Sequence, residues 1–424
     1  MLAARASAAR NASRAARSFA TVVDAQGVKL AAADNGQPTS AVTFLLKAGS
    51  RYETKPGAAH VLKNFAFRSA GSRSALGTVR EAELYGGVLT SSLSREHIAL
   101  TAEFLRGDEQ IFVDLLASTL TSSKFLGHEF SEYVAPVVAS ESTLASVNPA
   151  TRAIELAHSL AFRNGLGSPL FAPEHSDLTV DDVRAYAASA FAKGNLAVVG
   201  TGIDASTLQA LLDKHLSGAS AGAAASSPAS SYFGGETRVD SHSGPQTVFI
   251  GYGVSGQPSP ALSVLAAHLS TTPSVKWSKG LSPLAAALPE GASVQTVLFP
   301  YSDATLFGFL VQGATGQQVK EAAKAVTQAL KDAKNVKGED VKKAVAKAKF
   351  SAASALDARE TIVEAVSQKI FSSSDLSAES ALSALDKVNE SELAKAVSSL
   401  TSAKPTYVAI GDIRSLPYSD EVGL

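Results

Sequence analysis

The chain has 424 residues, with 38 Lys plus Arg against 39 Asp plus Glu, a formal charge of −1, and no Cys. The absence of Cys excludes disulfides, thiolate nucleophiles, zinc–thiolate sites and cysteine-ligated iron–sulfur clusters. The near-neutral charge argues against nucleic acid as the main partner, because a phosphate-binding surface needs a basic excess. At 45% hydrophobic, a chain of this length is expected to fold into two or three globular domains.

The amino terminus has the composition of a targeting segment. Residues 1–20, MLAARASAARNASRAARSFA, contain four Arg and no acidic residue. Arg10, Arg14 and Arg17 would fall within roughly 60° of one helical face. We therefore predict a mitochondrial presequence over 1–20, cleaved near Ala20, in preference to a disordered basic tail.

The remaining chain carries the same order of patterns twice, about 206 residues apart. Each copy has a strand ending in Gly, a Pro-started helical pattern, a second strand before a long amphipathic helix, and a final strand. A constant offset of this kind indicates a tandem duplication. We predict an α+β fold with two homologous halves, each a mostly antiparallel sheet packed with helices. The paired strands are expected at 41–49 and 246–253, 97–105 and 305–311, and 195–200 and 406–411.

Residues 217–231 separate the two copies. Their sequence, SGASAGAAASSPASS, contains only Ser, Gly, Ala and Pro, a composition typical of a flexible linker. The predicted organisation is a presequence at 1–20, one domain at 21–216, the linker at 217–231 and a second domain at 232–424. No apolar run of 18 or more residues occurs, so we expect a protein peripheral to any membrane.

Gly200-Thr201-Gly202-Ile203-Asp204-Ala205 has the G-x-G-x-x-A spacing of a dinucleotide-binding turn. Such a site also needs a second strand and an acidic residue about 20 positions further on, which binds the ribose. The linker begins before either could follow. We therefore interpret the stretch as an ordinary turn between a strand and a helix, and predict no cofactor.

A lysine-rich stretch lies in the second copy. Nine Lys fall between Lys320 and Lys349, against four acidic residues. A surface for anionic lipid or an acidic partner is one interpretation. Val326 and Leu330 belong to an apolar stripe at helical spacing, which favours the alternative of two helices with a solvated basic face.

The segment 48–67, AGSRYETKPGAAHVLKNFAF, predicts a strand end, a turn and a helix, and Tyr85-Gly86-Gly87 and Ser94-Arg95-Glu96-His97 follow later. This layout resembles the amino-terminal region of the pitrilysin and mitochondrial processing peptidase family, whose zinc motif H-x-x-E-H lies on that helix. In that motif two His bind zinc and the Glu takes a proton from the zinc-bound water. The resemblance places Glu141 near the family's third ligand.

The zinc motif is degenerate in this chain. Its window reads His60-Val61-Leu62-Lys63-Asn64, so Lys63 stands in place of the base and Asn64 in place of the second His. An ammonium group cannot accept a proton at neutral pH, and a neutral amide binds zinc poorly. We predict that the chain is not an enzyme and has no catalytic, metal-binding or cofactor-binding residue, with His60 a packed or hydrogen-bonded helix residue.

Two kinds of non-catalytic family member remain open. A presequence-binding subunit of the mitochondrial processing peptidase would have a Gly-rich loop in the second half. Ser274–Leu284, SVKWSKGLSPL, has one Gly and is similar to the core subunits of ubiquinol–cytochrome c reductase, respiratory complex III. That resemblance, which we favour, implies a structural subunit for assembly and stability on the matrix side of the mitochondrial inner membrane. The implied partners are a second core subunit, cytochrome b, the cytochrome c-type subunit and the iron–sulfur protein in a dimeric complex, with anionic lipid contact left open.

Overall fold

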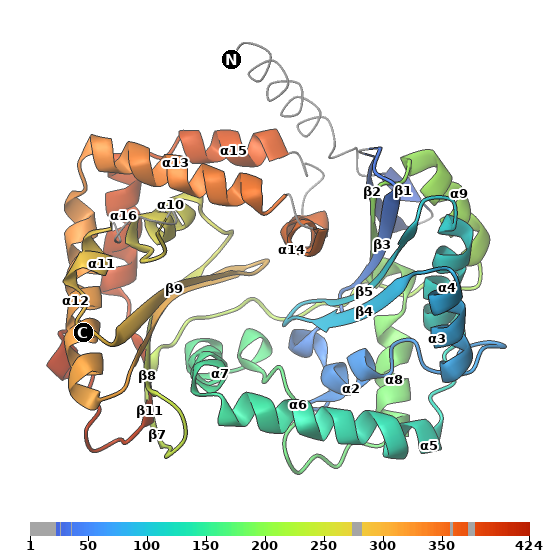
Figure 1. The fold of residues 1–424 in the computed structure, drawn as a ribbon, viewed down its shortest axis with the longest axis horizontal. Coiled ribbons are helices and arrows are strands. Elements are labelled where there is room, and N and C mark those ends of the chain that lie inside the picture. The colour runs from blue at the N-terminus through green and yellow to red at the C-terminus, as the bar shows by residue number, and fades with distance from the viewer. Residues whose placement is uncertain (1–22, 26, 35, 274–281, 357–358, 372–377) are drawn as a thin grey trace. The chain divides into compact units, whose positions relative to one another are not determined.

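The computed structural model describes residues 23–25, 27–34, 36–273, 282–356, 359–371 and 378–424 (Figure 1). The predicted presequence and most of the segment around Trp277 lie outside these residues. The chain forms two compact units. Unit 1 comprises residues up to Ser142, Pro169–Ser227 and Ala355–Ala381, and unit 2 comprises Thr143–Ser168, Pro228–Ser354 and Leu382–Leu424.

Unit 1 is built on a six-stranded sheet in the order β1-β2-β6-β3-β5-β4. β2 and β6 are parallel, and every other neighbouring pair is antiparallel. The central strands β3 and β6 are buried along nearly their whole length, which explains why both read as apolar runs rather than alternating patterns. The strands are β1 (Val23–Ala25), β2 (Val28–Ala33), β3 (Thr39–Leu46), β4 (Val88–Leu93), β5 (Ile98–Leu105) and β6 (Leu196–Thr201).

Unit 2 is built on a five-stranded sheet in the order β7-β11-β8-β10-β9. Its single parallel pair is β7 with β11, and the other pairs are antiparallel. This order repeats that of β2-β6-β3-β5-β4 in unit 1, strand for strand. The strands are β7 (Gly235–Asp240), β8 (Gln246–Ser255), β9 (Ala292–Pro300), β10 (Ala304–Gly313) and β11 (Thr406–Gly411).

The spacing of matching strands agrees with the predicted duplication. β3 and β8 begin at residues 39 and 246, β5 and β10 at 98 and 304, and β6 and β11 at 196 and 406. The predicted fold class is confirmed: both sheets are mostly antiparallel, and helices pack against them. Residues 217–231 form neither helix nor strand. The backbone N–H of Lys193 donates to the Ser220 carbonyl at 2.9 Å, and the backbone N–H of Ala225 donates to the side-chain oxygen of Asn195 at 2.5 Å. These two hydrogen bonds hold part of the segment against unit 1.

Helix starts follow local capping signals. Thr179 with Asp182, and Thr315 with Gln318, form capping boxes in which each side chain bonds the other's backbone N–H. The helices other than α7 are α2 (Ala58–Asn64), α3 (Ala75–Leu84), α4 (Glu109–Thr121), α5 (Gly127–Glu129), α6 (Ala135–Val147), α8 (Val180–Ala190), α9 (Ala205–His215), α10 (Pro260–Leu269), α11 (Pro283–Ala287), α12 (Gly316–Asp332), α13 (Gly338–Ser354), α14 (Arg359–Ile370), α15 (Ala378–Asp386) and α16 (Glu390–Ser402). In the described part of the chain, no helix has the length and apolar character needed to cross a membrane.

Two helices are exchanged between the halves of the sequence. α7 (Pro149–Phe162) precedes every strand of unit 2, yet it packs on β8 and β11 through Ala153, Ala157 and Ala161, all fully buried. α14 comes from the second half and packs on β3 and β6 of unit 1 through Val366 and Ile370. Each sheet is therefore covered on one face by a helix from the other half of the sequence.

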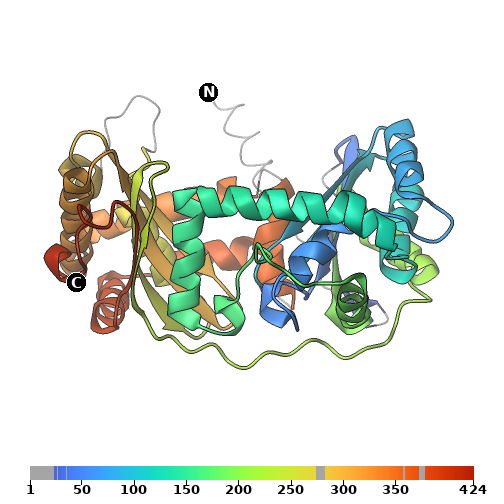
Figure 2. The ribbon, with the colours of Figure 1, turned by 90° about the horizontal axis from the view of Figure 1, so that it is seen from below.

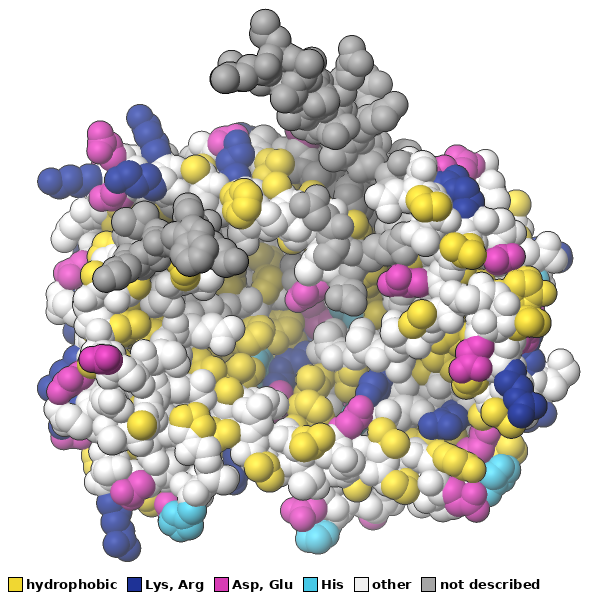
Figure 3. Space-filling model, in the orientation of Figure 1, with side chains coloured by type: hydrophobic (Ala, Val, Ile, Leu, Met, Phe, Trp, Pro, Cys, Tyr) yellow, Lys and Arg dark blue, Asp and Glu magenta, His cyan; other side chains and the backbone are white. Residues whose placement is uncertain are grey.

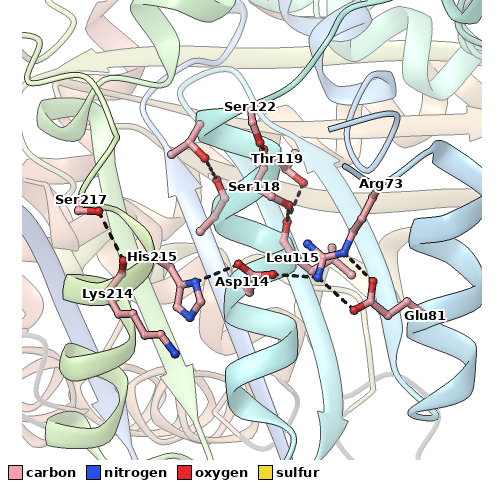
Figure 4. Close-up of polar contacts among 12 residues, drawn as sticks. Arg73, Glu81, Asp114, Leu115, Ser118, Thr119, Ser122, Lys214, His215 and Ser217 are labelled. Atoms are coloured by element: carbon pink, nitrogen blue, oxygen red, sulfur yellow. Dashed lines mark hydrogen bonds and ion pairs between the residues drawn. The ribbon is translucent and has the colours of Figure 1, made fainter. Parts of the chain in front are cut away.

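A polar network joins three helices of unit 1 (Figure 4). Asp114 of α4 accepts hydrogen bonds from Arg73 Nη2 (2.8 Å) and from His215 Nδ1 of α9 (2.9 Å). Arg73 also pairs with Glu81 of α3, through Nε at 2.5 Å and Nη2 at 3.0 Å. The hydrogen bonds that Arg73 donates to Glu81 and, with a smaller effect, to Asp114 outweigh burial and raise the pKa of Arg73. This network fixes α3 and α9 against α4.

Candidate functional site

The candidate site lies on α2, whose start is set by Gly57 and Glu53. Gly57 has φ 89°, and a Cβ there would lie 2.6 Å from the Ala172 Cβ, so only glycine fits. Glu53 Oε2 accepts backbone hydrogen bonds from Gly57 (3.1 Å) and Ala59 (3.2 Å) and so caps the helix. Burial raises the pKa of Glu53 to about 7 despite these two hydrogen bonds.

His60, Lys63 and Asn64 of α2 all contact Glu141 of α6; we call these four residues the α2–α6 polar cluster. His60 Nε2 lies 2.6 Å from Glu141 Oε2, and Lys63 Nζ lies 2.7 Å from Glu141 Oε1. Asn64 Nδ2 donates to Glu141 Oε2 at 2.9 Å and to the His60 carbonyl at 3.2 Å. The structure therefore brings together every residue of the degenerate motif with the glutamate singled out from the sequence.

The hydrogen bonds determine the tautomer of His60. The backbone N–H of Ala172 donates to His60 Nδ1 at 3.1 Å, so the ring proton is on Nε2 and is donated to Glu141. His60 is 2% exposed and packs edge-on against Phe171, with ring centroids 5.4 Å apart. Burial lowers the pKa of His60, which keeps the imidazole neutral. As predicted, His60 is a packed, hydrogen-bonded helix residue.

Glu141 is an anion in this cluster. Burial alone would raise its pKa, but the hydrogen bonds from Lys63, Asn64 and His60 together lower it to about 2. A carboxylate, an ammonium group and a neutral imidazole leave the cluster without net charge. The Lys63 ammonium thus balances Glu141, the role that a metal ion has in the intact family motif.

These residues do not fit a catalytic zinc ion. Zinc needs at least three protein ligands from His, Cys, Asp or Glu, and the residues that the structure describes contain no group of three that could hold a metal. Asn64 uses its amide nitrogen as a donor to Glu141, whereas a ligand must offer a lone pair. Lys63 offers no base for activating water. No hydrolytic step can be derived from this arrangement.

Other residues of the resembling layout form the scaffold around α2. Arg51 and Glu96 make a buried ion pair at 2.8 Å, with their side chains 4% and 5% exposed. His97 stacks on Phe371 at 5.2 Å between ring centroids, and burial lowers its pKa to about 4. The sequence did not predict this pair. Arg51 follows the predicted strand 41–49 and Glu96 precedes the predicted strand 97–105, and it is the antiparallel pairing of β3 with β5 that brings these two strand ends together.

The stretch Gly200–Ala205 is the turn between β6 and α9, as interpreted from the sequence. Asp204 caps α9 by accepting hydrogen bonds from the backbone N–H groups of Ser206 (3.0 Å) and Thr207 (3.3 Å). Gly202 has φ 74°, and a Cβ there would lie 2.6 Å from the Thr39 carbonyl oxygen. The helix cap explains Asp204, and the close approach to the Thr39 backbone explains Gly202, so neither residue requires a bound nucleotide to account for it.

The lysine-rich stretch forms α12 and α13. Val326 and Leu330 are buried, while Lys320 pairs with Glu421 at 2.6 Å and Lys349 with Asp386 at 2.8 Å. Figure 3 shows Lys and Arg interspersed with acidic side chains over the region of α13. The basic face is therefore ion-paired and solvated, opposite an apolar stripe, as the preferred interpretation predicted.

Two family models match most of the chain. Residues 29–174 match the model described as insulinase, peptidase family M16, and residues 177–347 match the model described as the peptidase M16 inactive domain. The first match contains α2 and the polar cluster. The second contains the strands of unit 2 from β7 to β10.

Similar curated proteins share one printed name, cytochrome b-c1 complex subunit 2, mitochondrial. The protein of that name from Cryptococcus neoformans var. grubii is 44% identical over 99% of this chain and 98% of its own length. The Neurospora crassa protein is 36% identical over 94% of this chain and 90% of its own length. The human protein is 27% identical over 93% of this chain and 90% of its own length.

A solved structure gives the same architecture. A protease from Helicobacter pylori superposes with a TM-score of 0.80 at 17% identity, covering 93% of this chain and 98% of the other. At this level of identity the likeness supports the two-unit fold alone.

Proposed function

The chain belongs to the M16 peptidase family, and we propose that it is a structural core subunit, of the core protein 2 type, in the mitochondrial cytochrome b-c1 complex. This complex is ubiquinol–cytochrome c reductase, respiratory complex III. The sequence similarity to the curated relatives supports this assignment, because it extends over nearly the whole chain, including both units. These relatives all have the name cytochrome b-c1 complex subunit 2.

The α2–α6 polar cluster carries the proposal that the chain is not itself a peptidase. Lys63 is an ammonium group held 2.7 Å from Glu141, in the position of the family's general base. A residue that is already protonated and ion-paired cannot activate water. We therefore assign no catalytic, metal or cofactor-binding residue to this chain.

The proposed place of the protein is the matrix side of the mitochondrial inner membrane, peripheral to the bilayer. The proposed partners are core protein 1, cytochrome b, the cytochrome c-type subunit and the iron–sulfur protein, within a dimeric complex. The basic, acid-free composition of residues 1–20 supports mitochondrial import. Domain limits at 1–20, 21–216, 217–231 and 232–424 remain our proposal for the sequence organisation.

Purification from mitochondria in mild detergent tests the assignment. A core subunit is expected to co-purify with cytochrome b, the cytochrome c-type subunit and the iron–sulfur protein. Deletion of the chain is expected to abolish the assembled complex while imported precursors are still cleaved. Recovery of the chain as a soluble heterodimer, with uncleaved precursors after its deletion, would instead identify a presequence-binding subunit of the processing peptidase.

Metal analysis tests the non-catalytic part separately. The purified chain is expected to contain far less than one zinc per molecule and to cleave no peptide. Stoichiometric zinc accompanied by peptide cleavage would refute it, whatever complex the chain belongs to.

A further inference from the structure

α6 is an apolar helix that buries little of itself in this chain. Of its 13 residues, all of them described, only Val138 is buried, whereas seven of the 13 residues of α4 are buried. Helices of this length are marginal in water unless an apolar face is packed. Figure 2 shows α6, in blue-green, as one continuous helix.

The outward residues of α6 follow the spacing of a helix–helix contact. Val137, Ser140, Leu144 and Val147, which we call the α6 seam, are spaced three, four and three residues apart, as at the a and d positions of a heptad. Val137, Leu144 and Val147 are 42%, 68% and 56% exposed. Leu144 and Val147 lie roughly 120° and 180° around the helix from Val138, so the seam faces away from the core.

The α6 seam is uncharged. The helix has the sequence APVVASESTLASV, whose single charged residue, Glu141, is bound to His60 and Lys63. An exposed helix face normally carries Lys, Arg or Glu. The absence of basic residues argues against anionic lipid or nucleic acid as the covering partner.

We propose that the α6 seam is covered, in the assembled complex, by an uncharged apolar α-helix of another subunit. This inference rests on the proposed function, because it requires a multi-subunit assembly. Spacing of three and four residues favours a partner helix crossing at about 20°. Ser140, the small residue within the seam, leaves room for close approach.

A second copy of this chain is a poorer occupant. A stable two-chain interface buries about 800 Å² and 20 to 30 residues on each partner, and four seam residues provide only a fraction of that. The seam therefore fits one contact among several in a larger assembly. The α2–α6 polar cluster has a role in this arrangement, because it ties α6 to α2 and so holds the seam in place.

Photocrosslinking in the full chain tests the proposal. A benzophenone amino acid is placed at 144, in the seam, or at 146, an exposed position on the same helix outside it. The complex is then purified, irradiated and mapped by mass spectrometry. Position 144 is expected to crosslink to residues of one helix in another subunit, with a yield at least about fivefold above position 146.

Charge substitution provides the second measurement. Leu144→Lys is expected to lower recovery of the chain in the complex by about fivefold or more, and Ser146→Lys to leave it unchanged. Both residues are exposed, so both isolated variants should melt within about 1 °C of the unsubstituted chain, which excludes misfolding as the cause.

The outcomes separate the two proposals. If the unsubstituted chain does not co-purify with other complex subunits, the proposed function fails. If it does co-purify, the seam proposal is overturned by equal crosslinking at 144 and 146, or by crosslinks to lipid, to the same chain or to a second copy. Unchanged recovery of the Leu144→Lys chain would also overturn it.

Discussion

The two units share one strand order but differ in the helix that follows the first long antiparallel strand. In unit 1, α2 follows β3 and carries the polar cluster with Glu141. In unit 2, α10 follows β8 in the corresponding place, has no Lys, Arg, Asp or Glu, and buries Ala261, Leu262, Val264, Leu265 and Leu269. The architecture therefore does not need a polar cluster at this position. Unit 1 has one because its helix carries His60, Lys63 and Asn64 at the spacing of the zinc motif that it resembles.

The difference shows two ways of stabilising the same position of the fold, one polar and one apolar. In the cluster, Lys63 supplies a positive charge and Asn64 supplies a hydrogen-bond donor to the same carboxylate. A partly buried carboxylate left unpaired would be costly, so Glu141 depends on these partners. In unit 2 the same position is stabilised by apolar packing instead.

The largest expected effect is on unit 2. Leu265 of α10 is fully buried, so Leu265→Ala should reduce the free energy of unfolding by about 3 kcal/mol through lost burial and a cavity. Denaturant unfolding monitored by circular dichroism measures this. The control is Leu84→Ala on α3, where the side chain is 79% exposed and the expected loss is below about 0.5 kcal/mol. Equal losses would contradict the packing comparison.

A smaller loss is expected from the polar cluster. Glu141→Gln removes the charge that pairs with Lys63 and should cost about 1 to 2 kcal/mol at pH 7, discounted because the Glu141 side chain is one-third exposed. The folded-state pKa of about 2 lies below the ordinary 4.5, so this stabilisation is present above pH 4.5 and lost as the pH falls toward 2. Unfolding curves between pH 3 and 7 should show the two proteins converging at low pH. Exposed Glu132→Gln is the control and should give no such convergence.

The opposite pH dependence is expected at Glu53. Its folded-state pKa of about 7 lies above the ordinary 4.5, so ionisation destabilises the folded state progressively as the pH rises from 4.5 to 7. Glu53→Gln should therefore become more stable than the unsubstituted chain, by about 1 kcal/mol, at pH 8 and not at pH 4. Melting temperatures at the two pH values test this. A variant less stable at pH 8 would show that the capping carboxylate outweighs its burial.

The smallest change in stability accompanies a gain of metal binding. The double substitution Lys63→Glu with Asn64→His rebuilds the H-x-x-E-H spacing on α2, with Glu141 already 2.6 Å from His60. We expect about one zinc per chain by elemental analysis after dialysis, against far less than one for either single substitution. Failure of the double variant to bind zinc would mean that the cluster has lost the metal geometry as well as its ligands.

Much of the fold was predictable because its signals are local. Apolar strand patterns in two ordered sets indicated the duplication, and Thr179 with Asp182 marks a helix start by side chain to backbone hydrogen bonds. The exchange of α7 and α14 was not predictable. Their apolar stripes show that each packs on a sheet, but a stripe such as Ala153-Ala157-Ala161 does not specify which sheet.

The sequence by itself determined that the H-x-x-E-H positions of α2 do not form a catalytic zinc site, because Lys63 and Asn64 are unable to act as base and ligand wherever α2 lies. Only the tertiary structure decided what Lys63 and Asn64 contact, since the ion pair of Lys63 with Glu141 joins residues 78 positions apart. It also decided that the apolar residues of α6 face outward. Hydrophobic spacing predicts that a face will be covered, and which element covers it depends on the packing of the whole chain and of its partners.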